Sequence, residues 1–334
     1  MSDVALSVRD LKTFFYTNQR CNKAVNGLSF DIKKGKTLCV VGESGCGKSV
    51  TAAAIMQLLP RLSRIESGSI VYHSEQGDIH IEKLARNGAK MRAIRGAEIS
   101  MIFQDPMTAL NPVFTIGAQI AENLLYHSAL RGRHLRDKVI DLLRTMGIPL
   151  PERRIRDYPH QFSGGMRQRA MIAMAMACNP KILIADEPTT ALDVTIQAQI
   201  FELMVNLKRE HGTAIMLITH DMGVVAELAD DVAVMYMGNI VEAGTAEEVL
   251  RHPVHPYTRA LLASIPILGR GRNQVIDAIP GSTPDPFDRP PGCQFAPRCQ
   301  HRVAACETMP AETYTSPTHR MMCWRYEELA ANGA

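Results

Sequence analysis

The sequence predicts an α/β fold with a central parallel sheet, an antiparallel β layer, an inserted helical subdomain and a small cysteine-rich C-terminal extension. Four apolar runs of strand length predict the parallel sheet, because strands buried on both faces lack polar alternation. The first run, residues 37–41, leads through a glycine-rich loop into a helical run rich in alanine and leucine. Apolar residues at helical spacing between the second and third runs predict the inserted subdomain.

Composition limits the class of protein. The 334 residues suffice for one large domain with an appendage or for two domains, and 46% of them are hydrophobic, as in a globular core. The net charge of +3 argues against a general nucleic-acid binder, so we expect no nucleic-acid partner. No apolar run reaches about 18 residues, and the N-terminus lacks an apolar signal segment. We therefore expect the eight cysteines to be thiols or metal ligands, not disulfides.

The antiparallel layer is predicted from alternating apolar and polar side chains. Strands are expected at residues 4–8, 24–32, 67–72 and 78–81, with a polar loop through residue 22. A later segment, residues 231–242, reads as a hairpin that turns at Gly238.

Residues 42–49 fit the phosphate-loop pattern G-x-x-x-x-G-K-[S/T] at every fixed position, in a strand–loop–helix context. The glycines let backbone N–H groups close around phosphate oxygens, and the following helix N-terminus adds partial positive charge. The Lys48 side chain would reach the β- and γ-phosphates, and the Ser49 hydroxyl would ligate Mg²⁺. We therefore expect nucleotide contacts at Gly42, Glu43, Ser44, Gly45, Cys46, Gly47, Lys48, Ser49 and Val50.

The other three apolar runs end in functional side chains. Residues 98–105, 181–187 and 214–220 close on Gln104, Asp186, Glu187 and His220. In open parallel sheets, ligands bind at the carboxyl ends of the strands. These side chains should therefore converge with Lys48 on one nucleotide. The aromatic residues Phe14, Phe15 and Tyr16 offer a face for adenine stacking, and packing under the sheet is the alternative for each.

The helical subdomain is expected over about residues 105–178. Residues 115–130 and 136–146 carry apolar side chains at helical spacing, and residues 170–177 form a helix that is apolar on all sides. Ser163 is a good N-cap, and Gly164 and Gly165 permit close approach of a ligand to the backbone. The start of this buried helix is therefore a second candidate anion site.

Residues 163–169, Ser-Gly-Gly-Met-Arg-Gln-Arg, resemble the signature motif of ABC ATPases. Gln104 resembles the Q-loop glutamine, Asp186-Glu187 a Walker B pair with its catalytic glutamate, residues 191–193 the D-loop, and His220 the switch histidine. The motifs occur in the family's order and at its usual distances. The usual signature is Leu-Ser-Gly-Gly-Gln, so Phe162 and Met166 depart from it, and the contribution of that glutamine is open. The resemblance implies a P-loop NTPase (RecA-like) core over residues 4–250.

A narrower resemblance covers nearly the whole chain. Residues 103–112, 186–200, 255–262 and 290–293 are similar to segments of bacterial dipeptide/oligopeptide/nickel importer ATPases. It implies an ABC ATPase domain over residues 4–250 and a peptide-importer-type extension over residues 251–334. It also implies that Phe15 stacks on adenine, with Tyr16 as the fallback.

The resemblance implies a role for each site residue. Mg²⁺ would be held by Ser49 and Asp186, with Gln104 sensing the metal and the attacking water. Glu187 would polarise that water, and His220 would contact the γ-phosphate. The signature residues Ser163, Gly164 and Gly165, with Asp193 of the D-loop, would act on the ATP of a partner subunit.

One phosphate loop and one signature per chain imply a second ABC ATPase subunit, in a homodimer or a heterodimer. The resemblance further implies two transmembrane permease subunits, an extracytoplasmic substrate-binding protein and a peripheral position at the cytoplasmic face of the bacterial inner membrane. The expected function is to power import of di- or oligopeptides, with glutathione and nickel open. The alternative is a non-transport ABC ATPase in DNA repair or translation; the long coiled-coil insertion or second ATPase domain typical of those proteins is missing from this sequence.

Four cysteines follow a proline-rich segment in the pattern C-x5-C-x6-C-x16-C, at Cys293, Cys299, Cys306 and Cys323. Clustered thiols in a segment with little apolar content suggest a metal that staples a small domain. Spacing alone does not separate zinc, an iron–sulfur cluster and unligated thiols. The resemblance favours a [4Fe-4S] cluster, with Zn²⁺ as the alternative metal.

Overall fold

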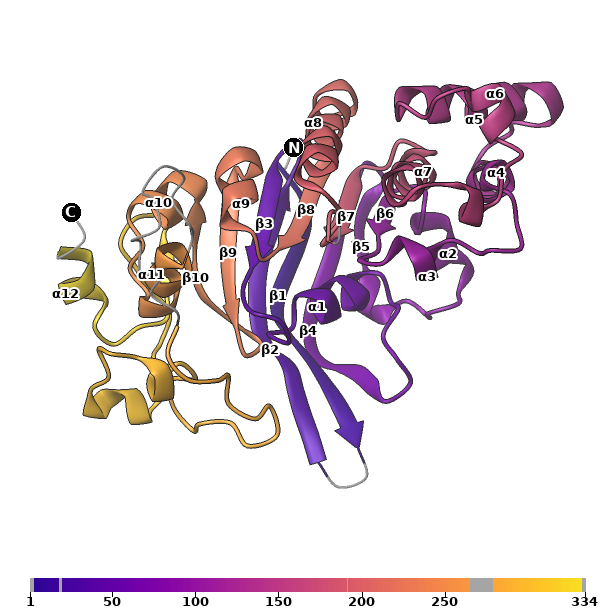
Figure 1. The fold of residues 1–334 in the computed structure, drawn as a ribbon. Helices are drawn as coiled ribbons and strands as arrows, with labels where there is room; N and C mark the ends of the chain where they lie inside the picture. Colours follow the sequence, from indigo (N-terminus) through magenta and orange to yellow (C-terminus); the bar gives the residue numbers. More distant parts are fainter. Residues whose placement is uncertain (1–2, 18–19, 191, 265–278, 332–334) are drawn as a thin grey trace.

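The computed structural model describes residues 3–17, 20–190, 192–264 and 279–331, and these residues form two sheets flanked by helices (Figure 1). The strands are β1 (Val4–Thr17), β2 (Arg20–Lys33), β3 (Thr37–Val41), β4 (Ser63–Ser74), β5 (Gly77–His80), β6 (Ile99–Ile102), β7 (Ile182–Asp186), β8 (Ala214–Thr219), β9 (Asp231–Tyr236), β10 (Asn239–Thr245), β11 (Thr313–Tyr314) and β12 (Arg320–Met321).

The α-helices lie between and after these strands. They are α1 (Lys48–Ile55), α2 (Ala89–Ile94), α3 (Pro106–Ala109), α4 (Ile116–His127), α5 (Gly132–Thr145), α6 (Pro151–Arg154), α7 (Gly164–Met176), α8 (Val194–His211), α9 (Met222–Leu228), α10 (Ala246–Arg251), α11 (Pro256–Ala263) and α12 (Tyr326–Ala331). No helix among the described residues is both long enough and apolar enough to span a bilayer.

The larger sheet has the order β11-β12-β10-β9-β3-β8-β7-β6. Strands β9, β3, β8, β7 and β6 run parallel to one another, and β10 returns antiparallel to β9. Every residue of β3, β7 and β8 is buried, which explains their unbroken apolar sequences. The four apolar runs are thus neighbouring parallel strands, as predicted, and the loops at their carboxyl ends share one edge of the sheet.

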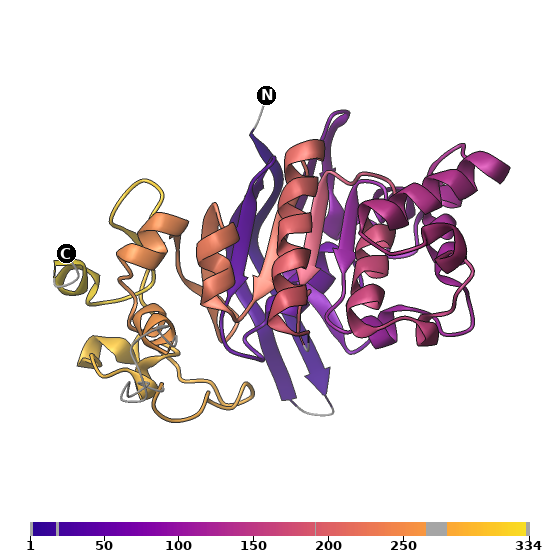
Figure 2. The ribbon, with the colours of Figure 1, turned by 45° about the horizontal axis from the view of Figure 1, so that its top comes forward.

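The second sheet, β2-β1-β4-β5, is the predicted antiparallel layer. It packs with α1 against one face of the central sheet, where Val40 and Ile184 point into the shared core. Helices α8 and α9 cover the opposite face, onto which Cys39 and Leu183 point. Figure 2 shows α8 lying along the sheet with β1 and β2 behind it.

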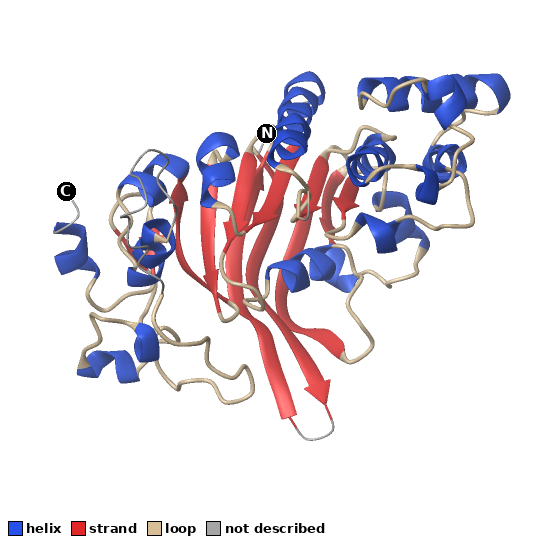
Figure 3. Cartoon of the chain, viewed as in Figure 1, coloured by secondary structure: helices blue, strands red, loops and turns tan. Residues whose placement is uncertain are grey.

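The inserted subdomain contains α3 to α7 at one end of the sheet, as predicted (Figure 3). Helix α5 is amphipathic, and its apolar residues Val139 and Leu143 are buried with the residues of α4 and α7. Helix α7 includes residues 170–176 of the predicted run and ends there, with Ala177 as its C-cap; the run is almost wholly buried, as its uniform apolar sequence predicts.

The C-terminal segment extends the central sheet. Strand β12 pairs antiparallel with β10 through Glu242 and Met321, and β11 pairs with β12. The buried Glu242 carboxylate accepts hydrogen bonds from the Val254 and His255 amides and lies 2.8 Å from Nε2 of His319. The extension is therefore anchored to the ATPase core by strand pairing and by buried polar contacts.

Candidate nucleotide-binding site

The phosphate loop joins β3 to α1, and two of its glycines are required by close backbone contacts. A Cβ on Gly42, whose φ is +151°, would lie 2.2 Å from the carbonyl oxygen of Met235. A Cβ on Gly47, whose φ is +106°, would lie 2.3 Å from that of Ala24. The loop thus packs closely between β2 and β9, and these contacts restrict its backbone conformation.

The two residues that follow Gly47 lie at the start of α1. The buried Lys48 ammonium donates to the carbonyl oxygens of Gly42 at 2.7 Å and Glu43 at 3.0 Å. The Ser49 hydroxyl donates to Oδ1 of Asp186, at the end of β7, at 3.0 Å. Burial raises the pKa of Asp186, and the neighbouring Glu187 charge raises it further. A hydroxyl and a carboxylate in this position are oxygen ligands suited to Mg²⁺.

Glu187 has a left-handed backbone with φ of +45° and directs its carboxylate toward residues from three segments. Gln104, just after β6, donates to Oε2 at 2.9 Å, and the Thr190 hydroxyl donates to the same atom at 3.0 Å. Nδ1 of His220, after β8, lies 3.5 Å from Oε1. The structure therefore brings Gln104, Glu187 and His220 together, and Ser49 and Asp186 together beside them.

The residues of the signature and the D-loop cap adjacent helices. Ser163 caps α7 by accepting from the Met166 amide, and Asp193 caps α8 by accepting from the Ile196 amide. A Cβ on Gly165 would lie 3.0 Å from Ile196, so the two helix starts pack together. Within the described chain, no hydrogen bond or ion pair joins residues 163–165 to the phosphate loop, and Ala191 lies outside the described residues.

The two candidates for adenine stacking differ in their surroundings. The Tyr16 hydroxyl donates to the Glu66 carboxylate, and the Arg64 guanidinium lies 4.7 Å from the centre of the Tyr16 ring. Phe15 is half-buried and pairs in the sheet with Asn22 and Ser63. Because Glu66 and Arg64 already contact the Tyr16 side chain, Phe15 stays the predicted adenine contact.

Comparison with known proteins assigns the family. The family described as "ABC transporter" matches residues 25–190, and "Oligopeptide/dipeptide transporter, C-terminal region" matches residues 241–306. The chain is 50% identical over 328 residues to "Dipeptide transport ATP-binding protein DppD" of Bacillus subtilis, covering 97% of this chain and 96% of that protein. This chain belongs to the ABC transporter ATPase family. It is an ATP-hydrolysing transporter subunit.

Other relatives agree. "Oligopeptide transport ATP-binding protein AppD" of Bacillus subtilis is 48% identical to this ABC ATPase, over 98% of each chain. The solved dimeric structure of a post-hydrolysis state of the ATP-binding cassette MJ0796, bound to ADP and Pi, superposes with a TM-score of 0.63 at 26% identity. The superposition covers 72% of this chain and 98% of that one, which confirms the predicted P-loop NTPase fold.

The four tail thiols of this ABC ATPase line one small cavity with His255, Phe295, His301 and Trp324. Burial raises the pKa of Cys293 and Cys299, and it raises that of Cys323 to about 11. Among the described residues, no group of three or more His, Cys, Asp or Glu side chains is arranged to hold a metal ion. The thiols thus share a cavity without forming a coordination sphere.

Two residues of the extension contact the phosphate loop, and neither is predicted from the sequence. The Tyr257 hydroxyl accepts a hydrogen bond from the Glu43 amide, and Arg298 pairs with the Glu43 carboxylate. Tyr257 lies in a segment that resembles peptide importers, but nothing in the sequence links either residue to Glu43.

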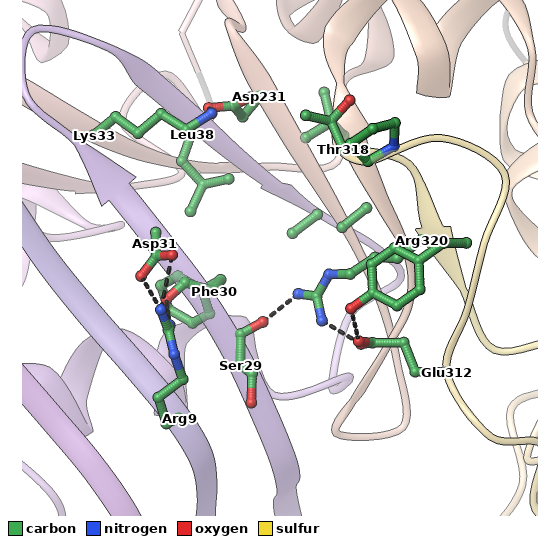
Figure 4. A pocket seen from close by; sticks show the side chains of 16 residues that line it. Arg9, Ser29, Phe30, Asp31, Lys33, Leu38, Asp231, Glu312, Thr318 and Arg320 are labelled. Carbon is green, nitrogen blue, oxygen red and sulfur yellow. Dashed lines mark hydrogen bonds and ion pairs between the residues drawn. The ribbon is translucent and has the colours of Figure 1, made fainter. Parts of the chain in front are cut away.

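A cavity of about 470 Å³ lies between β2, β9 and the tail, away from the phosphate loop (Figure 4). Its charges pair with one another: Arg9 lies 2.7 Å from Asp31, Lys33 lies 2.8 Å from Asp231, and Arg320 contacts Glu312. The Arg320 guanidinium also donates to the carbonyl oxygen of Ser29 on β2. This cavity therefore marks the seam where the tail meets the antiparallel layer.

Proposed function

We propose that this ABC ATPase powers the import of dipeptides or oligopeptides through separate permease subunits. The match of residues 241–306 to the C-terminal region of oligopeptide/dipeptide transporters carries the proposal. The near full-length similarity to proteins named for dipeptide and oligopeptide transport supports it. Glutathione and nickel are the other substrates within the same resemblance. A role in DNA repair or translation is not favoured, because the relatives are transport proteins.

The chemistry follows from the placement of charge at the strand ends. Phosphoryl transfer depends on positioning and on neutralising charge at the phosphates. We assign the phosphates to residues 42–50 and the Mg²⁺ ligands to Ser49 and Asp186, where the metal would supply charge neutralisation. The Glu187 carboxylate would accept a proton from the attacking water, with Gln104 orienting that water. His220, whose side chain is 64% exposed, would contact the γ-phosphate from the open side of the site.

The proposed assembly follows from the separation of the signature from the phosphate loop. Ser163 and Asp193 cap α7 and α8, and among the described residues neither forms a hydrogen bond with Lys48, so they would face the ATP of a second ABC ATPase subunit. The solved MJ0796 cassette is dimeric, which supports this arrangement. Two permease subunits and an extracytoplasmic binding protein would complete the transporter, with this subunit on the cytoplasmic face of the bacterial inner membrane.

The test is transport by the complete complex in vesicles, with the binding protein supplied on the outer side. We expect ATP-dependent uptake of a labelled dipeptide or oligopeptide, and loss of that uptake when this subunit carries Glu187→Gln. Uptake of glutathione or Ni²⁺ in place of peptide would overturn the peptide assignment. ATP hydrolysis by the complex with no uptake of any of these substrates would overturn the import proposal.

We also propose that Cys293, Cys299, Cys306 and Cys323 hold a metal centre, a [4Fe-4S] cluster in preference to zinc. The observation that favours it is the shared cavity. Cys323 is more than 20 residues from Cys293 and Cys299 in the sequence, and yet all three thiols line the same small cavity. Four thiolates are the donor set of both cluster and zinc sites. A bound metal would supply cross-linking of the tail, as it does in other small domains.

A further inference from the structure

A buried ion pair joins the C-terminal extension to the phosphate loop. The Arg298 guanidinium contacts both carboxylate oxygens of Glu43, at 2.6 Å to Oε2 and 3.0 Å to Oε1. Such two-pronged pairing fixes orientation as well as distance. The side chain of Arg298 is only 5% exposed and that of Glu43 is 29% exposed, so water screens the pair weakly.

The extension holds Arg298 rigidly. Its Nε donates to the carbonyl oxygen of Pro280 at 2.9 Å, and its guanidinium lies 5.9 Å from the ring centres of both Tyr236 and Phe295. Those two rings pack edge-to-face, with centres 5.3 Å apart. Because packing and hydrogen bonds hold the Arg298 guanidinium in place, the guanidinium is already positioned to pair with the Glu43 carboxylate.

A second contact reaches the backbone of the same loop residue. The Glu43 amide donates to the hydroxyl of Tyr257 at 2.8 Å, and Tyr257 is fully buried against Tyr236 and Phe295. The remaining polar group of Glu43, its carbonyl oxygen, accepts from the Lys48 ammonium at 3.0 Å. The extension therefore contacts both the side chain and the amide of Glu43, and the carbonyl oxygen of Glu43 in turn accepts a hydrogen bond from Lys48.

We propose that Arg298 is a positioning residue for ATP binding that acts through Glu43. It holds the phosphate loop in the conformation that receives the phosphates, so that less conformational freedom is lost when ATP binds. Arg298 lies between Cys293 and Cys299, so a change in that segment of the tail reaches the phosphate loop through this pair. The extension is thereby part of the nucleotide site.

The proposal predicts an effect on ATP affinity more than on turnover. Gln104 and Glu187 follow β6 and β7, and their mutual hydrogen bond does not involve the phosphate loop. Loss of Arg298 should therefore weaken phosphate binding about equally in the ground state and the transition state. Such a loss raises KM and leaves kcat unchanged.

The first test measures the Kd of ATP for the full-length chain, and KM and kcat in the assembled transporter. We expect Arg298→Met to raise Kd and KM about tenfold, the effect of losing one well-placed charged contact, with kcat within about twofold of wild type. Arg298→Lys should recover part of the affinity, because lysine restores the charge without the fork. The matched control is Arg302→Met, since Arg302 is a 55% exposed arginine of the same tail, 3.9 Å from Glu307. It should leave Kd unchanged.

A double-mutant cycle with Glu43→Gln separates positioning from general damage to the fold. In the Glu43→Gln background, Arg298→Met should add little further loss of ATP affinity, because their shared contact is already weakened. An equal loss in both backgrounds, an unchanged Kd for Arg298→Met, or a fall in kcat at unchanged KM would each overturn the proposal. If Arg298→Met does not fold, Arg298→Lys must raise Kd at unchanged kcat and Glu43→Gln must raise Kd, and failure of either overturns the proposal.

Discussion

Gln104 and Glu187 are joined by a hydrogen bond of 2.9 Å from Nε2 to Oε2. They follow the neighbouring strands β6 and β7, and Gln104 is the last residue before the segment that leads into the helical subdomain. Any displacement of that subdomain therefore bears directly on the carboxylate that we assign to catalysis. The hydrogen bond between Gln104 and Glu187 therefore connects the helical subdomain to the residue that we assign to ATP hydrolysis.

Replacing Glu187 by glutamine should abolish most ATP hydrolysis and preserve ATP binding. The amide keeps the size of the side chain but cannot accept a proton from water, and general-base catalysis is worth roughly 10²–10⁴-fold in rate. Lys48 and Ser49, which contact neither oxygen of Glu187, keep their places. Steady-state ATPase assays and ATP binding on the purified transporter measure the two effects, with both ATPase subunits changed if the partner site is active. Hydrolysis near the wild-type rate would remove Glu187 from the mechanism.

Replacing Ser163 by arginine should damage the composite site formed with the partner's phosphate loop. The bulky cation would fill the space at the start of α7, where Ser163 now caps the helix. Binding of ATP to this chain's own Lys48 site should survive in the isolated subunit. The matched control is Ser163→Ala, which loses the cap at a cost of about 1 kcal/mol but leaves the glycine amides open.

Assays of ATP binding by the isolated subunit and of ATP hydrolysis by the complex distinguish the two variants. If Ser163→Arg folds correctly but loses ATP binding in the isolated subunit, the signature serves its own chain, and the cross-subunit arrangement is wrong.

Stability should depend on pH through Glu248, which fastens the tail to α10. Burial opposes ionisation, but hydrogen bonds from Ser316, Thr245 and Thr318 outweigh it and lower the pKa of Glu248 from 4.5 to about 2. A carboxyl with a depressed folded-state pKa stabilises the fold above its unfolded pKa, and that contribution is lost as pH falls from about 4.5 to about 2. Glu248→Gln should therefore melt at a lower temperature than wild type at pH 7, and the gap should close near pH 2.

Thermal unfolding of both proteins across this pH range tests the effect. Glu247→Gln is the control on the same helix, because the Glu247 side chain is exposed and lies 3.8 Å from Arg251. It should melt close to the wild-type temperature at pH 7, because an exposed ion pair contributes little to stability. A Glu248→Gln gap that is as wide at about pH 2 as at pH 7 would contradict the assignment.

The tail cysteines should bind one [4Fe-4S] cluster. Protein purified without oxygen should be brown, with broad absorbance near about 400 nm and roughly four irons per chain, as four cysteine ligands imply. Cys299→Ser should lose the iron, whereas Cys21→Ser, at an exposed thiol outside the tail, should retain it. Stoichiometric zinc without iron would replace the cluster with a zinc staple, and four free thiols without metal would exclude both.

The sequence by itself determined the parallel core and the phosphate loop. Strands buried on both faces are predominantly apolar, and residues 38–41 and 182–185 show such a run directly. Gly42 and Gly47 could be assigned to the phosphate loop from the sequence, because both positions have positive φ angles that other residues rarely adopt. The sequence defines the ends of the strands less well. The local sequence predicts a polar loop through residue 22, but β2 begins at Arg20, because pairing with β1 outweighs the local preference.

Only the tertiary structure decided how the extension meets the nucleotide site. Arg298 and Glu43 are 255 residues apart, and nothing in the local sequence of either residue points to the other. Their contact depends on β12 pairing with β10 and on the aromatic packing of Tyr236 and Phe295. Local patterns report which face of an element is buried, whereas the partner of a buried charge is set by which distant segments the fold brings together.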